Sequence, residues 1–257
     1  MELRPLGDTG LQVSPLGLGT VKIGRTLQVK YPRPFALPSD AQVVELLSLA
    51  RDLGINLIDT APAYGIAQAR LGRLLPGPRD QWVIVSKVGE IFENGRSRFD
   101  FGYRYTIAAV EESLRQLRTD YLDSVLIHSN GDDVRILREE GVVDALERLK
   151  ERGLIRSHGI SSKSVAGGLE ALSRLDLVMA TAHLDYDDER PVFEAAERLG
   201  KGVLVKKGLA SGHLANRGVE AAMRHVFSLP GVSAMIVGTI DPDHLRQNVA
   251  AAEAALP

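Results

Sequence analysis

The sequence contains no cysteine. Disulfide bonds, thiolate metal sites and cysteine nucleophiles are therefore excluded for this chain. Its six histidines are scattered, and none belongs to an H-E-x-x-H motif or to a similar metal-binding spacing. We therefore expect no bound metal, and a chemistry that depends on other side chains.

An excess of one charge and long apolar runs are also missing. The chain has 31 basic and 33 acidic residues, for a formal net charge of −2. A general nucleic-acid binder normally carries a basic excess, so that class is disfavoured. No apolar run approaches the length of a membrane span, and the first five residues show no apolar signal core. We expect a cytoplasmic protein that binds neither nucleic acid nor membranes.

The composition supports a large folded core. Of the 257 residues, 44% are hydrophobic and 25% are charged, a balance typical of globular domains and not of disordered chains. A length of about 250 residues is typical of one α/β barrel. We see no internal repeat and no low-complexity tract, so residues 1–257 are expected to form a single domain.

Short runs rich in valine, isoleucine and leucine recur along the chain with little alternation, as in strands buried on both faces. These predicted strands are residues 16–19, 55–58, 82–86, 124–127, 155–160, 177–181, 203–205 and 234–237. Amphipathic patterns between them predict helices over residues 40–50, 106–117, 142–149, 164–172, 190–199, 215–227 and 242–254. Repeated strand–helix units imply a closed (β/α)₈ TIM barrel. An open doubly wound sheet is the alternative, but no G-x-G-x-x-G follows the first strand.

Two segments depart from this repeat. Residues 3–6 and 11–13 flank Asp8-Thr9-Gly10, a hairpin signal, and such a β-hairpin would plug the N-terminal bottom of the barrel. Residues 22–38 have no clear periodicity and are expected to form a long loop. Long loops on barrels are often functional.

Polar residues gather where three consecutive predicted strands end. Asp59 and Tyr64 follow the second strand, Lys87 ends the third and His128 ends the fourth. Each residue alone has an ordinary structural role, as a turn cap, a packing ring, a solvated cation or a hydrogen-bonded imidazole. Because catalytic groups of TIM barrels lie at the C-terminal ends of the strands, the four together indicate a catalytic set.

These residues belong to a wider pattern that resembles the aldo/keto reductase superfamily. Its parts are Gly17-Leu18-Gly19-Thr20, Asp59-Thr60-Ala61 with Tyr64-Gly65, Ser86-Lys87, Ile127-His128, Gly159-Ile160-Ser161, and Ile236-Val237-Gly238 through Asn248. The resemblance runs from the first strand to the last helix. It implies an NAD(P)H-dependent oxidoreductase that reduces an aldehyde or ketone to an alcohol, or the reverse, by hydride transfer.

The resemblance also assigns catalytic roles. Tyr64 would be the general acid, whose phenol has an ordinary pKa of about 10 and needs help to exchange a proton near neutral pH. Lys87 would lower the pKa of Tyr64 by its nearby positive charge, and Asp59 would hold Lys87 in place. His128 would donate a hydrogen bond to the substrate oxygen.

Cofactor contacts follow from the same resemblance. The nicotinamide amide is expected against Ser161, Ser162 and His183, the last two standing where the family has Asn and Gln, and both can form hydrogen bonds. Lys206 stands where an aromatic ring usually stacks on the nicotinamide, and it cannot stack in that way. The other expected contacts are Gly19, Thr20, Asp59, Gly208, Leu209, Ser211, Gly238, Thr239, His244, Gln247 and Asn248.

Two other functions remain open from the residues alone. One is a non-catalytic nicotinamide-cofactor sensor or regulatory subunit on the same barrel. The other is a barrel lyase or isomerase that uses Lys87 as a Schiff-base amine, which requires a lowered lysine pKa, whereas pairing with Asp59 raises it. The partner of an enzyme would be a small carbonyl or alcohol. By their position in loops, the candidate substrate contacts are Val21, Lys22, Tyr31, Phe35, Ile91, Phe92 and Phe99.

The loop after the last strand generates a prediction about cofactor choice. NADP(H) is the expected cofactor and NAD(H) the alternative, yet Ile240 and His244 stand where a basic clamp for the 2′-phosphate is usual, and Asp241 and Asp243 would repel it. Each missing charge-assisted hydrogen bond costs about 1.5–3 kcal/mol, or roughly one to two decades of selectivity. We predict that dissociation constants measured side by side will favour NADPH over NADH by less than about a thousandfold (roughly 4 kcal/mol). A stronger preference would reveal a clamp elsewhere, with Arg246 the nearest permanent cation.

Overall fold

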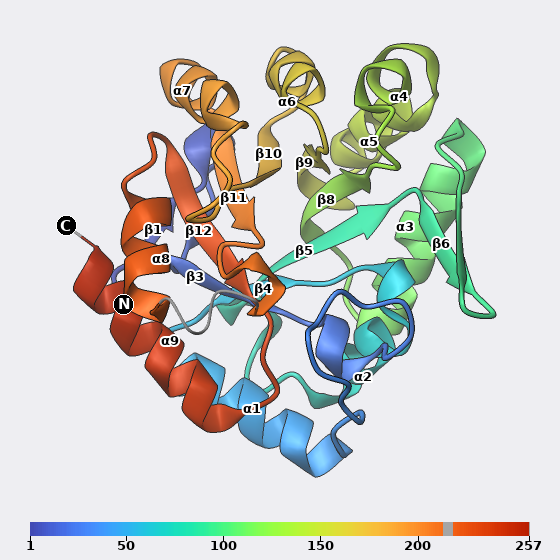
Figure 1. The fold of residues 1–257 in the computed structure, drawn as a ribbon. Coiled ribbons are helices and arrows are strands. Elements are labelled where there is room, and N and C mark those ends of the chain that lie inside the picture. The colour runs from blue at the N-terminus through green and yellow to red at the C-terminus, as the bar shows by residue number, and fades with distance from the viewer. Residues whose placement is uncertain (213–217, 257) are drawn as a thin grey trace.

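The structure, a computed structural model, describes residues 1–212 and 218–256. Within them, eight parallel strands close into a barrel in the order β10-β11-β12-β3-β4-β5-β8-β9 (Figure 1). The barrel strands are β3 (Leu16–Gly19), β4 (Leu57–Asp59), β5 (Val83–Val88), β8 (Leu122–His128), β9 (Ile155–Ser161), β10 (Leu177–Thr181), β11 (Gly202–Lys206) and β12 (Val232–Val237). The predicted (β/α)₈ TIM barrel is confirmed.

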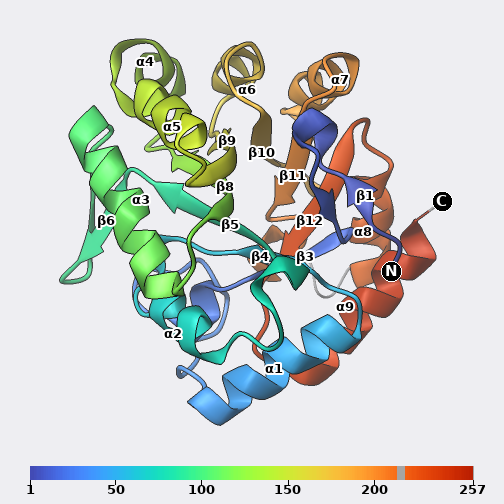
Figure 2. The same ribbon diagram turned by 180° about the vertical axis from the view of Figure 1, so that it is seen from behind.

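Helices surround the strands on the outside of the barrel (Figures 1 and 2). They are α1 (Asp40–Asp52), α2 (Ala67–Leu74), α3 (Tyr103–Leu117), α4 (Asp133–Glu139), α5 (Val142–Glu151), α6 (Val165–Leu172), α7 (Arg190–Arg198), α8 (Val219–Phe227) and α9 (Pro242–Ala255). The start of α1 is fixed by a capping box, in which Ser39 Oγ accepts from Gln42 N at 3.2 Å and Gln42 Oε1 accepts from Ser39 N at 2.9 Å.

Several elements differ from the sequence-based expectation. Helices α2 and α4 were not predicted, and the buried face of α2 includes Gln68 and Arg70, which weakens its apolar periodicity. Strand β4 begins at Leu57, two residues after the predicted start, and α3 begins at Tyr103, ahead of the predicted Thr106. The helix predicted from Ala215 begins at Val219 among the described residues, and Ala215 itself lies outside them.

The barrel interior has an apolar layer and a polar layer. Leu57, Val85, Leu126 and Leu204 belong to one buried apolar cluster inside the barrel. Since side chains along a strand alternate between its two faces, the residues two positions later lie on the same inner face, nearer the C-terminal end. These residues are Asp59, Lys87, His128 and Lys206. The polar layer therefore follows directly from strand periodicity.

The N-terminal hairpin closes the opposite end, as predicted. Its strands are β1 (Arg4–Pro5) and β2 (Gln12–Val13), which pair antiparallel. Leu6 is fully buried and joins the apolar cluster of the interior. The backbone N–H of Asp8 donates to the carbonyl of Gly200 at 2.8 Å, next to the start of β11. The interior is thus sealed at the N-terminal ends of the strands.

A second hairpin was not predicted. Strands β6 (Glu90–Glu93) and β7 (Arg96–Phe99) pair antiparallel between β5 and α3. The hairpin projects from the barrel beside α3 (Figure 1). Its first strand begins at Glu90, three residues after Lys87, just beyond the C-terminal end of β5.

The plug generates a stability prediction. Leu6→Ala should lower the free energy of unfolding by about 2–5 kcal/mol, because it removes buried methyl groups and leaves a cavity. Leu3→Ala is the matched control, since Leu3 is 45% exposed, and it should change stability by less than about 0.5 kcal/mol. Urea unfolding of both variants measures the difference. Equal stabilities would mean that the hairpin does not seal the interior.

Candidate active site

Four predicted side chains meet at the C-terminal rim of the barrel. Asp59, Lys87 and His128 end or nearly end β4, β5 and β8. Tyr64 joins them from the short 3₁₀ helix Pro62–Tyr64, which directly follows β4. Thr20 supports this arrangement, because its hydroxyl donates to the Asp59 carbonyl at 2.9 Å.

Lys87 is buried and held by two acceptors. Its ammonium group forms an ion pair with Asp59 Oδ1 and donates to the Thr60 carbonyl at 3.0 Å. The ammonium nitrogen lies 4.8 Å from the centre of the Tyr64 ring. Burial lowers the pKa of Lys87 below its ordinary value, and the negative charge of Asp59 opposes that change. The Lys87 ammonium is thus held beside the Tyr64 ring, although its burial removes hydrating water, which is unfavourable for a charge.

The pKa values of Lys87 and Tyr64 both differ from expectation, because burial outweighs the raising effect of Asp59 on Lys87 and acts on Tyr64 as well. We expected Lys87 to lower the pKa of Tyr64, but burial raises it well above 10, and the charge of Asp59 raises it further. The physical reason is that a buried phenolate loses its hydration and also lies near carboxylates. The phenol of Tyr64 is therefore protonated at neutral pH.

His128 contacts a carboxylate that the sequence analysis missed. Its Nδ1 atom lies 2.9 Å from Glu90 Oε2, at the start of β6. Its ring meets the Tyr64 ring edge-on, with centroids 6.2 Å apart and an interplanar angle of 88°. Burial lowers the pKa of His128, while Glu90 acts in the opposite direction. The imidazole thus lies between a phenol and a carboxylate.

Glu90 is itself firmly held. Ser97 Oγ donates to Glu90 Oε1 at 2.6 Å, and Arg25 Nη1 lies 3.5 Å from the same oxygen. Burial alone would raise the pKa of Glu90, but His128, Ser97 and Arg25 outweigh it and bring the pKa to about 2. The sequence hints at Glu90 only by placing a carboxylate three residues after Lys87. Without the hairpin fold, the sequence does not reveal that this side chain faces His128.

A second polar group occupies the expected nicotinamide side of the rim. Lys206 reaches from β11 across β10 to β9, where its ammonium donates to Ser161 Oγ at 2.9 Å and to the Ser162 carbonyl. Burial lowers the pKa of Lys206 to about 7, against the raising effect of Glu189. The hydroxyl of Ser162 is buried and has no hydrogen-bond partner among the described residues.

The remaining expected cofactor residues are spread around this rim. Gly19 ends β3, and Gly208 and Leu209 follow β11, with Ser211 in the 3₁₀ helix Ala210–Gly212. His183 forms a tight turn in which its Nδ1 accepts from Asp185 N at 3.3 Å. Residues Gly238, Thr239, His244, Gln247 and Asn248 lie between β12 and the first turns of α9, and of the last two only Asn248 is buried.

The start of α9 is already capped by a carboxylate. Asp241 Oδ1 accepts from Asp243 N at 2.8 Å and from His244 N at 3.2 Å. The free N–H groups of a helix N-terminus would otherwise attract an anion such as a phosphate. Asp241 occupies that position with a negative charge.

Part of the long first loop folds toward the rim. Lys22 Nζ lies 4.1 Å from the centre of the Tyr31 ring, and Tyr31 meets Phe35 edge-on at 5.7 Å. A Cβ atom added to Gly238 would approach the Tyr31 hydroxyl to 2.8 Å, so this loop touches the segment after β12. Among the other expected substrate contacts, Phe92 packs under the Arg25 guanidinium at 3.4 Å. Val21 begins a 3₁₀ helix, Ile91 lies in β6, and Phe99 stacks on Phe101.

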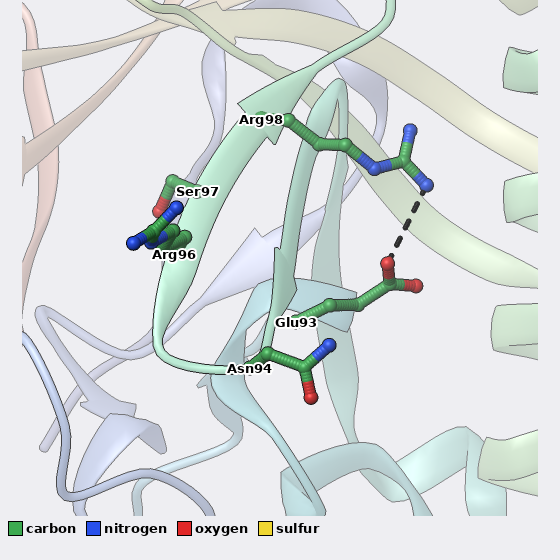
Figure 3. Close-up of a pocket in the computed structure, with 5 residues that line it drawn as sticks. All are labelled: Glu93, Asn94, Arg96, Ser97 and Arg98. Atoms are coloured by element: carbon green, nitrogen blue, oxygen red, sulfur yellow. Dashed lines mark ion pairs between the residues drawn. The ribbon is translucent and has the colours of Figure 1, made fainter.

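A surface hollow of about 620 Å³ lies elsewhere, on the β6–β7 hairpin. It is lined by Glu93, Asn94, Arg96, Ser97 and Arg98, and an ion pair joins Arg98 to Glu93 (Figure 3). None of the four rim residues lines it. Across residues 1–212 and 218–256, no acidic and histidine side chains are grouped as metal ligands. Over the same residues, no helix is long and apolar enough to cross a membrane.

Comparisons with known proteins agree with this architecture. The sequence model of the Aldo/keto reductase family matches residues 15–221. A Pseudomonas aeruginosa structure, provisionally described as an aldo-keto reductase, is 54% identical, with a TM-score of 0.92 over 99% of this chain and 96% of its own. The holo form of aldo-keto reductase AKR11C1 from Bacillus halodurans is 27% identical, with a TM-score of 0.81 over 100% and 92%.

Curated relatives are more distant. Aldo-keto reductase YhdN of Bacillus subtilis is 32% identical over 64% of this chain, and that match spans only 48% of YhdN. L-galactose dehydrogenase of Arabidopsis thaliana is 29% identical over 85% of this chain and 68% of its own length.

The buried lysine of β11 generates a pH prediction. Because the pKa of Lys206 is about 7 in the fold and 10.5 ordinarily, the unfolded chain binds an extra proton between these pH values. Stability therefore rises with pH across that window. Relative to Lys206→Met, the wild type should gain more than about 1 kcal/mol of unfolding free energy between pH 7 and pH 10. This bound is low, because a shift of a single pKa unit already corresponds to about 1.4 kcal/mol. Urea titrations at both pH values measure this gain, with Lys30→Met as the exposed-lysine control. A constant difference between wild type and Lys206→Met would show that Lys206 does not titrate differently in the fold.

Proposed function

Because the chain belongs to the aldo/keto reductase family, we propose that it reduces an aldehyde or ketone to an alcohol, or catalyses the reverse reaction, with a nicotinamide cofactor and Tyr64 as general acid. The observation that carries the proposal is the fixed Lys87 cation. It is paired with Asp59 and lies 4.8 Å from the Tyr64 ring, at the end of the barrel where TIM-barrel chemistry occurs.

Tyr64 is suited to give its proton to a carbonyl oxygen. Its raised pKa keeps the phenol protonated, so the proton is present when negative charge develops on the substrate oxygen. Lys87 then stabilises the phenolate that remains, because a cation in a poorly hydrated site interacts strongly with a nearby anion. Asp59 and the Thr60 carbonyl keep Lys87 in position throughout.

His128 orients the substrate oxygen from the other side. Its ring stands edge-on to Tyr64, so one carbonyl oxygen placed between the two can meet both a phenol and an imidazole. Two polar groups directed at one oxygen provide the position and field that hydride transfer requires.

The rim of β9 and β11 fits a nicotinamide carboxamide. The partnerless hydroxyl of Ser162, the hydroxyl of Ser161 and the Lys206 ammonium offer both donors and acceptors there. When bound, the cofactor supplies or accepts the hydride. The residues after β12, including buried Asn248, would hold the adenosine end, and Asp241 at the start of α9 disfavours a 2′-phosphate.

The experiment that tests the proposal is removal of the phenol. Tyr64→Phe should lower the rate of aldehyde reduction by 10²–10⁴-fold, the usual contribution of a general acid, while the cofactor dissociation constant stays nearly unchanged. Tyr121→Phe is the control, because Tyr121 directly precedes β8 at the opposite end of the barrel. Stopped-flow turnover of an aldehyde panel with NADPH and NADH supplies the rates.

Two outcomes would contradict the proposal. Full turnover by Tyr64→Phe would remove this phenol from the mechanism. A wild-type protein that binds the cofactor but reduces no aldehyde or ketone would favour the non-catalytic sensor.

A further inference from the structure

The charge of Lys206 has no part in the proposed function as stated so far. Lys206 ends β11 on the inner face of the barrel, two residues after Leu204 of the buried apolar cluster. Asp59, Lys87 and His128 have the same position on β4, β5 and β8. A cofactor ring that lies over the barrel mouth, within reach of a carbonyl held at His128, therefore faces this polar layer, Lys206 included.

The Lys206 side chain runs along this inner face. Its ammonium donates to Ser161 Oγ at 2.9 Å and to the Ser162 carbonyl, both at the end of β9, so it crosses the end of the intervening strand β10. Part of the surface of Lys206 stays accessible at the rim. The ammonium is therefore held at a defined place in the mouth of the barrel, where a bound ligand can meet it.

The two lysines of the polar layer differ in how their charge is balanced. Lys87 forms an ion pair with Asp59. The acceptors that hold Lys206, a hydroxyl and a backbone carbonyl, are both uncharged. Glu189 acts on Lys206 through its charge and not through a hydrogen bond. When protonated, Lys206 thus adds a positive charge to the barrel mouth that no contacting carboxylate among the described residues offsets.

We propose that Lys206 is a specificity-determining residue that makes the site bind the reduced nicotinamide cofactor in preference to the oxidised one. The oxidised nicotinamide ring carries a positive charge and the reduced ring is neutral, whereas the phosphates and the adenosine are the same in both forms. A fixed cation in a poorly hydrated site repels the oxidised ring and not the reduced one. The inference rests on the proposed function, and it means that the site takes up the reduced form from a mixture and releases the oxidised form more readily.

The protonation of Lys206 sets the strength of this preference. Burial lowers the pKa of Lys206 to about 7. Glu189, directly before α7, and Asp133, on α4, act in the opposite direction, whereas the neighbouring cations Lys207 and Lys163 reinforce the lowering. The ammonium is therefore the main form at pH 6 and the neutral amine at pH 9. The preference for the reduced cofactor should be strong at pH 6 and weak at pH 9.

Equilibrium binding without substrate tests the role of Lys206. Isothermal titration calorimetry at pH 6 gives dissociation constants for the oxidised and the reduced form of whichever cofactor, NAD(H) or NADP(H), binds more tightly. Lys206→Met removes the charge and the hydrogen bonds, and Lys206→Gln removes the charge but keeps a donor for Ser161. In both variants the ratio of the oxidised to the reduced dissociation constant should fall by about tenfold, the effect of losing one like-charge repulsion in a partly screened site.

Lys207→Met is the matched control, because Lys207 is the next residue and is exposed. Its charge is screened by solvent, and any attraction to the phosphates is common to both forms, so the ratio should stay within about twofold of the wild type. A pH series adds a second readout. The wild-type ratio should fall between pH 6 and pH 9 toward the value of Lys206→Met. His128, whose pKa the charge of Lys206 also lowers, titrates in both proteins, so the difference between them is assigned to Lys206.

The outcomes separate this inference from the proposed function. A ratio that changes by less than about threefold in the folded Lys206 variants would overturn the role of Lys206, whatever the activity. If neither variant folds, the wild type still decides, because an equal ratio at pH 6 and pH 9 would overturn the role as well. Full turnover by Tyr64→Phe beside a ratio that depends on Lys206 would reject the general acid and leave the Lys206 assignment intact. A wild type that binds neither redox form would reject both.

Discussion

Closure of eight parallel strands is the constraint on which the other features of this protein depend. In a closed barrel every second side chain must point inward, where space is limited and water is excluded. The interior is therefore filled by a buried apolar cluster, to which the N-terminal hairpin contributes Leu6. Asp59, Lys87, His128 and Lys206 follow this cluster at the C-terminal ends of their strands, so these polar groups gather at one end of the barrel.

Burial at that rim governs the electrostatics. Desolvation is the largest influence on Tyr64, Lys87 and His128, and in each case it disfavours the charged form. Lys87 forms an ion pair with Asp59, and Glu90 lies beside the His128 imidazole. For Lys87 and His128 the neighbouring carboxylate opposes the effect of desolvation, whereas for Tyr64 the charge of Asp59 adds to it.

Two segments outside the barrel strands, the β6–β7 hairpin and the first loop, add contacts to the rim residues. The β6–β7 hairpin brings Glu90 and Ser97 to the back of His128, and the first loop brings Arg25 to Glu90 and to the backbone beside Tyr64. Such segments are free to vary because the strands, and not the loops, carry the core.

The sequence by itself determined the barrel and the membership of the rim. Apolar runs mark the strands, and the period of two along them places Asp59, Lys87 and His128 on one inner face at one end, because local periodicity does not depend on distant contacts. Helix α2 escaped prediction because its buried face uses Gln68 and Arg70 in place of apolar residues.

Only the tertiary structure decided which partners these residues have. The contact of Glu90 with His128 depends on where β6 lies after it leaves β5, and Lys206 reaches Ser161 across an intervening strand. The raised pKa of Tyr64 likewise reflects its burial beside Asp59, which no spacing in the chain reveals. The physical reason is that the sequence pattern reveals which face of a strand a side chain is on. The distances between side chains, and the loss of their hydration, depend on how segments remote in sequence pack together.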